Sequence, residues 1–297
     1  MARTFNTDRF FFGRYYLLNI SIYGTLSALI AYFGSSLSGT SPLWVLVIVP
    51  LFLTRFRYIM FGAVTTAGFA LWSYAHELTW WLSVGFVGAL YVGHLTASVI
   101  HNAAHRNFHP KWLNSVLGEA CALQQLSAGL VVFRFIHSQH HAYPDDPIRD
   151  PHPPRGLSFW QFVDAARSLV AARLEAIYLE RWGDSQGSRR LWGQQNALLI
   201  IARFTKTMFW FALLGPKLFA LIYVPSYISN VFIFAAFNYY SHKEGSDGEM
   251  EIRDLSGSGY FDLCNRLFQG VMFHRTHHET PRQINPMAYA KSSEAAS

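Results

Sequence analysis

Ten of the thirteen histidines in this chain lie in four short groups, and their spacing suits metal binding. The groups are HNAAHRNFH at 101–109, HSQHH at 137–141, HRTHH at 274–278 and the single His242. Residues four apart on a helix share a face, so His101 and His105 direct their imidazoles to one side. In each HxxHH motif the first histidine lies on the same helix face as both later ones. The side chains of the two adjacent histidines point in directions about 100° apart around the helix axis. The two adjacent histidines can therefore serve different metal ions.

The number and type of these side chains indicate a site for two metals. The HxxxH pair and the two HxxHH motifs supply eight imidazoles, too many for one ion but suitable for two. Imidazole is a ligand for iron, zinc and copper. Cys121 and Cys264 form no CxxC pair, and the chain has no ExxH carboxylate pair. Iron–sulfur clusters, structural zinc and ferritin-type sites are therefore poor explanations.

The other histidines have simpler interpretations. His109 is followed by a proline and lies past the first helical turn, which favours a loop position. His242 ends the segment NYYSH after the last apolar run, and it is either a ligand, a neighbour of a ligand, or a polar residue that caps the helix. His76, His94 and His152 have no neighbouring partner in the sequence, and His94 is expected to be a core histidine.

The composition indicates that these histidines are positioned by a membrane protein. Of the 297 residues, 51% are hydrophobic, 16% aromatic and only 14% charged, which leaves few charges to cover a soluble surface. Apolar runs of about 18 residues or more can cross a hydrocarbon core of about 30 Å. We predict six membrane-crossing runs, at 15–34, 42–54, 58–76, 79–100, 197–215 and 217–240. The second run is short, so it is either a brief span or a re-entrant segment.

Arginine placement predicts the sidedness of these spans. Three arginines precede the first run and two follow the second, which makes both segments cytoplasmic under the positive-inside rule. Six crossings then put both termini and the histidine-rich regions 101–196 and 241–281 on the cytoplasmic side. A four-span alternative with an intramembrane hairpin keeps the same sidedness. The net charge of +6 includes no lysine run, so membrane headgroups explain it better than nucleic acid does.

These features predict an all-α integral membrane protein with one domain, 1–297. It would have a bundle of about six transmembrane helices, alternatively four, and a cytoplasmic helical cap that carries the histidine motifs. Within the cap, 115–136 is expected along the membrane surface or against the bundle. Five prolines make 143–156 a loop, and 159–182 has the pattern of an amphipathic helix. The tail 290–297 is expected to be disordered.

The histidine motifs resemble those of a known family. HNAAHRNFHPKWLNSVLGE and HSQHHAYPDDPIRDP are similar to the first two histidine boxes of membrane fatty-acid desaturases, and HRTHHETP is similar to the third. NYYSH is similar to the extra histidine motif of the membrane alkane monooxygenases, which belong to the same superfamily. The resemblance covers roughly 98–281. The HETP continuation departs from the usual third box, and there is no HPGG motif of a fused cytochrome b5-like domain.

The resemblance implies a membrane-bound non-haem di-iron centre with two iron ions, O₂ as co-substrate, and electrons from a separate donor such as ferredoxin, rubredoxin or cytochrome b5. Carried over to this chain, the iron ligands would be His101, His105, His137, His140, His141, His274, His277 and His278, with His242 as a ninth candidate.

The implied enzyme is an oxidoreductase that acts on an unactivated C–H bond of a fatty acyl or other lipid-like chain. That chain would be free or carried on coenzyme A, a carrier protein or a phospholipid. A desaturase is favoured, but a hydroxylase or an oxidative decarboxylase could use the same centre, because the position of the chain decides the outcome. A metal transporter is a further alternative. It predicts ionisable residues deep in several spans, and besides His94 these spans have few.

Two further sets of charged residues have open interpretations. Asp145, Asp146, Asp150 and Asp254 could support ligand histidines through the second ring nitrogen, or they could be solvated loop carboxylates. The arginines of the cytoplasmic region could dock an acidic electron donor or acyl carrier, or they could serve only as topology determinants.

Overall fold

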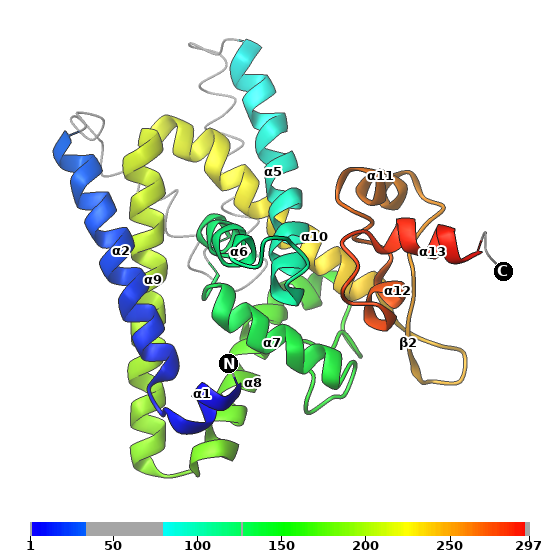
Figure 1. Cartoon of the computed structure of the whole chain (residues 1–297), viewed down its shortest axis with the longest axis horizontal. Coiled ribbons are helices and arrows are strands. Elements are labelled where there is room, and N and C mark those ends of the chain that lie inside the picture. Colours follow the sequence, from blue (N-terminus) through cyan, green and yellow to red (C-terminus); the bar gives the residue numbers. More distant parts are fainter. Residues whose placement is uncertain (1, 34–79, 126, 295–297) are drawn as a thin grey trace.

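The computed structural model describes residues 2–33, 80–125 and 127–294, and this part of the chain is mostly helical (Figure 1). The predicted spans 42–54 and 58–76 lie outside the described residues. One antiparallel pair of strands, His242–Glu244 (β1) and Met250–Ile252 (β2), follows the longest helical segment. The helices are α1 Ala2–Thr7, α2 Phe11–Phe33, α5 Trp80–His105, α6 Leu113–Gln124, α7 Leu130–Ala142, α8 Phe159–Trp182, α9 Gln186–Leu218, the π-helical turn η4 Phe219–Tyr223, α10 Val224–Ser241, α11 Gly259–Leu267, α12 His274–Glu279 and α13 Pro286–Glu294.

Three helical segments in the described part of the chain are long and apolar enough to cross a membrane: Phe11–Phe33, Val84–His105 and Gln186–Ser241. The first two contain most of the predicted runs 15–34 and 79–100. The third contains 197–215 and 217–240, with the expected turn between them. Gly215 has φ 69° and ψ 167°, a conformation that glycine tolerates, and Pro216 cannot continue the hydrogen-bond ladder of α9. The chain therefore turns sharply here, and α10 runs obliquely away from α9 and packs against α5 (Figure 1). The number of crossings and their sidedness stay predictions.

Helices α2 and α9 lie side by side along most of their length (Figure 1). Their contact contains a polar link formed by the buried Gln195 side chain. It accepts a hydrogen bond from Gly13 N at 3.0 Å and donates one to Arg9 O at 3.2 Å. Next to this link a core cluster of large side chains joins α1, α2, α7, α8 and α9, and includes Phe5, Phe12, Tyr16, Phe135, Tyr178 and Trp192. The cluster fixes α7 and α8 against the two long helices.

Helices α5 and α10 make the closest backbone contact near the histidine motifs. A Cβ at Gly93 would collide with the carbonyl oxygen of Ser226. The side chains around it donate across the interface, from Ser229 Oγ to Leu90 O at 2.7 Å and from Asn230 Nδ2 to Gly93 O at 3.0 Å. Because α5 ends in HNAAH and α10 ends beside His242, this contact sets the relative position of two histidine groups.

The predictions for the cap are confirmed in part. The amphipathic helix expected at 159–182 is α8, which begins with a capping box formed by Ser158 and Gln161. The apolar stretch 115–136 divides into α6 and α7, and Gly129, with φ 108°, begins α7 at a point where Tyr15 leaves no room for a side chain. The prediction that the tail is disordered from residue 290 is wrong for 290–294. These residues continue α13, which is initiated by Pro286 and capped by Asn285 Oδ1 accepting from Ala288 N.

We expect Gly93→Ala to lower the free energy of unfolding by about 1–3 kcal/mol, because the added methyl group forces α5 away from α10. Gly88→Ala is the matched control, since a Cβ at Gly88 on the same helix meets nothing within 4 Å. The control should be neutral or slightly stabilising. The measurement is the unfolding midpoint of both purified variants in detergent, and equal midpoints would contradict this account of the interface.

Candidate metal centre

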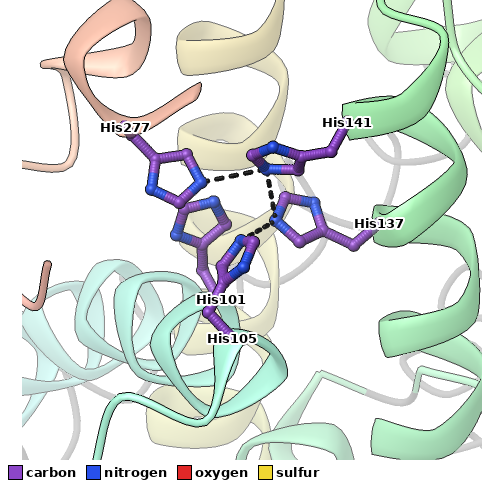
Figure 2. A group of neighbouring side chains, drawn as sticks. All are labelled: His101, His105, His137, His141 and His277. Atoms are coloured by element: carbon purple, nitrogen blue, oxygen red, sulfur yellow. Dashed lines mark hydrogen bonds between the residues drawn. The ribbon is translucent and has the colours of Figure 1, made fainter. Parts of the chain in front are cut away.

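Five histidines from three helices form the first metal-binding group (Figure 2). His101 and His105 come from α5, His137 and His141 from α7, and His277 from α12, and Figure 2 shows the five rings turned toward a common centre. One ring nitrogen of each lies within 4.8 Å of one nitrogen of every other.

The spacing of the nitrogens in this group is what shared coordination requires. The distances between Nε2 atoms are 2.7 Å for His105 and His137, 3.1 Å for His137 and His141, and 3.0 Å for His141 and His277 (Figure 2). Two imidazole nitrogens bound to one metal at right angles would lie about 3 Å apart, given metal–nitrogen bonds of about 2.1 Å. The group therefore has the dimensions of a metal site.

A second group lies directly beside the first. It consists of His140 from α7, His242 at the start of β1, and His274 and His278 from α12, again with one nitrogen each inside a 4.8 Å limit. The Nε2 atoms of His274 and His278 are 3.2 Å apart. The rings of His141 and His278, one from each group, stack with centroids 4.2 Å apart.

The adjacent histidines divide between the two groups, as helical geometry predicts. His141 and His277 belong to the first group, whereas their neighbours His140 and His278 belong to the second. All nine histidines predicted as ligands are thus brought together, five in one group and four in the other. Their role as ligands stays a prediction.

Three of these histidines carry a buried ring nitrogen that has no hydrogen-bond partner in the described part of the chain. The atoms are Nε2 of His101, His140 and His242. An unpartnered polar atom in a protein interior costs free energy, so it needs an explanation. A metal ion bound by the lone pair of each nitrogen would satisfy all three, which shows that the residues present fit such a group.

Two aspartates select the nitrogen that faces the second group. His140 Nδ1 lies 2.9 Å from Asp150 Oδ2, and His242 Nδ1 lies 2.8 Å from Asp145 Oδ2. A carboxylate accepts a hydrogen bond, so each Nδ1 carries the proton and each Nε2 keeps its lone pair. The other two aspartate candidates contact no histidine ring: Asp146 accepts from the backbone of its own loop, and Asp254 accepts from Thr276.

His152 has partners that sequence reasoning missed. It lies with His140 and Asp150 in a third group, its ring centroid is 4.8 Å from that of His140, and its backbone nitrogen donates to Asp150 Oδ1 at 3.0 Å. The signal in the sequence was the position of His152 two residues after an aspartate in the loop that follows HSQHH. His109 lies in a turn outside both groups, and His94 Nδ1 contacts Ser229 Oγ at 2.5 Å. His76 lies outside the described residues.

Burial favours the neutral form of His140, His141 and His278. It lowers the pKa of His140 from its ordinary 6.5 to about 3, although the hydrogen bond with Asp150 opposes this. Burial, followed by the charges of neighbouring histidines, lowers the pKa of His141 and of His278 to about 2. For Asp150, burial alone would raise the pKa, but the hydrogen bond with His140 and nearby charges lower it overall. Neutral imidazole is the form that binds a metal.

Polar side chains between the histidine boxes fix the positions of the boxes relative to one another. Arg134, on α7, donates to the last carbonyls of α5, with Nε 3.1 Å from Ala104 O. Asn107 Nδ2 donates to Asn102 Oδ1 at 2.8 Å and to Pro281 O at 3.1 Å, which links the first box to the segment after the third. These contacts explain why asparagines stand between the histidines of HNAAHRNFH.

The third box is held separately by Asp254. Its carboxylate accepts from Thr276 N at 3.0 Å and from Thr276 Oγ1 at 2.6 Å, inside HRTHH itself. A backbone bridge between Asp254 and Phe273 lies just before α12. This aspartate therefore positions α12 through its backbone rather than through a histidine ring.

A cavity of about 260 Å³ reaches the first group from the interior of the bundle. Its wall includes His101 and His137, together with Phe133, Phe234 and Phe237, and it extends between α7, α8, α9 and α10. An apolar space that ends at two imidazoles is suited to hold a hydrocarbon chain against a metal.

The comparisons with known proteins agree with this geometry. The family model described as fatty acid desaturase matches residues 78–284, a range that contains all nine of the converging histidines. No curated protein and no solved structure matches the chain.

We expect Asp145→Asn and Asp150→Asn each to weaken metal binding about 10- to 100-fold, because an amide does not fix the ring proton on Nδ1 as a carboxylate does. Asparagine tolerates the φ of 61° at Asp145, so the backbone should be unchanged. Asp146→Asn is the matched control, since its Oδ1 accepts only from backbone nitrogens. Metal retained after a mild chelator, measured by mass spectrometry, distinguishes them. Equal retention in all three variants would refute the orienting role.

We also expect the metal-free protein to lose stability as the pH falls below about 6.5. A histidine whose native pKa lies below its unfolded value resists protonation when folded. The unfolded chain therefore binds more protons in this range, and the free energy of unfolding decreases with falling pH. For His140 the loss continues toward its native pKa of about 3. The unfolding midpoint of chelator-treated protein should fall between about pH 7 and pH 5, and less steeply for His140→Gln. A flat profile would contradict the burial of neutral imidazoles.

Proposed function

Because this chain belongs to the fatty acid desaturase family, we propose that it is a membrane-bound, non-haem di-iron, O₂-dependent oxidoreductase. Its substrate would be an unactivated C–H bond in a fatty acyl or other lipid-like chain. The observation that carries the proposal is the convergence of nine histidines in two adjacent groups, three of them with a buried Nε2 that has no partner.

The two groups have the donor set for two iron ions. His101, His105, His137, His141 and His277 would hold one, and His140, His242, His274 and His278 would hold the other. Iron would supply the redox chemistry that O₂ activation needs, which zinc cannot supply because it does not change oxidation state. Asp145 and Asp150 would keep the ring protons of His242 and His140 on Nδ1, away from the metal.

The protein's own contribution to the reaction is to orient the chain and exclude water. The cavity presents Phe133, Phe234 and Phe237 beside His101 and His137, so a hydrocarbon segment would be held dry and close to the first group. The family match favours desaturation. Hydroxylation and oxidative decarboxylation use the same kind of centre and differ in which carbon is presented.

The orientation in the membrane and the electron supply are part of the proposal. The arginine distribution favours a cytoplasmic location for the histidine boxes and both termini, where a soluble ferredoxin, rubredoxin or cytochrome b5 could reach them. The chain would enter from the lipid, and its acyl group would be free or carried on coenzyme A, a carrier protein or a phospholipid.

We expect purified protein to retain about two iron ions per chain, and a host that expresses it to accumulate an oxidised fatty acyl product. His140→Ala should lose iron and abolish the product. Lipid and fatty-acid profiling by mass spectrometry separates the reactions, through loss of two hydrogens, gain of one oxygen, or release of CO₂. Weakly held, exchangeable zinc with identical lipid profiles would refute the proposal and favour metal transport.

A further inference from the structure

Two arginines line the apolar cavity at a distance from the histidines. Arg167 comes from α8 and Arg203 from α9. The guanidinium of Arg167 lies over the ring of Tyr227 on α10, with Cζ 5.1 Å from the ring centroid. At the other end of the cavity, the ring centroid of Phe237 on α10 is 6.1 Å from that of His101. Ten residues of helix separate Tyr227 from Phe237, which corresponds to about 15 Å.

Neither guanidinium has an acidic partner among the described residues. Arg203 Nε is buried without a hydrogen-bond acceptor, and the like charge of Arg167 acts on this guanidinium. Other buried cations of the same helices have a hydrogen-bond acceptor. Arg173 on α8 contacts Glu180 at 2.9 Å, and Lys206 on α9 donates to Ser127 O at 3.3 Å.

An unpaired charge in an apolar interior is costly, and two like charges increase that cost. A bound anion would relieve both. A carboxylate suits this site because arginine presents a planar fork of donors that matches its two oxygens. No further lysine or arginine is found among the cavity's described lining residues, so a phosphate-rich carrier such as coenzyme A would lack partners.

We propose that Arg167 and Arg203 bind the carboxylate of an unesterified fatty acid, whose chain extends along the cavity to His101 and His137. This inference rests on the proposed function and narrows it, because it selects the free acid over the thioester, the ester and the phospholipid. The arginines act as binding residues at the head of the substrate. They fix the distance from its carboxylate to the metal groups, and so decide which carbon faces them.

The test is equilibrium binding to iron-loaded, full-length protein in phosphatidylcholine nanodiscs without an electron donor, so that no turnover occurs. The probes are palmitate, methyl palmitate and palmitoyl-coenzyme A. Palmitate should bind at least about tenfold more tightly than its methyl ester, because the ester loses charge-assisted hydrogen bonds. Arg203→Gln and Arg167→Gln should each remove most of that preference. Arg190→Gln, an exposed site on α9, is the matched control and should keep it.

Folding and charge are controlled in the same experiment. Arg203→Gln removes an unpaired charge, so its unfolding midpoint without ligand should equal or exceed that of the native protein. Arg203→Lys keeps the charge and should keep part of the preference for the acid. Equal binding of acid and ester, or Arg203-dependent binding of palmitoyl-coenzyme A in preference to palmitate, would overturn the assignment.

The result is separable from the proposed reaction. Arginine-dependent palmitate binding without any oxidised product would refute the proposed function but support the carboxylate-binding site. Oxidation of an acyl thioester or alkane, without palmitate binding, would keep the reaction and reject this site.

Discussion

The structure depends on bringing nine imidazoles together in a largely buried space. Ring nitrogens 2.7 to 3.2 Å apart would repel one another if they were protonated, and burial already disfavours the charged form. Three Nε2 atoms have no hydrogen-bond partner among the described residues. A metal ion that took up these lone pairs would stabilise the arrangement, and its binding would then be coupled to folding of this region.

The surrounding polar contacts serve to hold these rings in place. Each histidine box is held by a different contact. Arg134 binds the last carbonyls of the helix that carries the first box, and Asp254 contacts Thr276 in the third. His140 of the second box, and His242, are held by hydrogen bonds from Nδ1 to a carboxylate. These contacts involve the backbone or the ring nitrogen Nδ1. They therefore set the direction of the rings and leave Nε2 free to be the ligand atom of the proposed metal site.

The cavity connects the apolar bundle to this polar centre. Its imidazole end suits a reacting hydrocarbon segment, and its guanidinium end suits an anion, with aliphatic and aromatic side chains between them. Arg167 and Arg203 come from helices separated by the α8–α9 turn, and α10 contacts both ends. If a chain binds as proposed, the same three helices would determine the positions of its head and of its reactive segment, and helices hold such positions more precisely than loops do.

The sequence by itself determined the histidine groups, the likeness to desaturases, the α8 helix and the turn at Gly215–Pro216. These rest on local periodicity and on the backbone limits of glycine and proline, which a single chain segment expresses. The helical stripe also predicted that adjacent histidines would separate into two groups. Only the tertiary structure assigned His242 to the second group, brought His152 beside His140, and distinguished Asp145 and Asp150 from Asp146. It also brought Arg167 and Arg203, which are 36 residues apart in the sequence, to the wall of one cavity. These pairings join segments that are distant in the chain, and no spacing rule relates such residues until the helices pack.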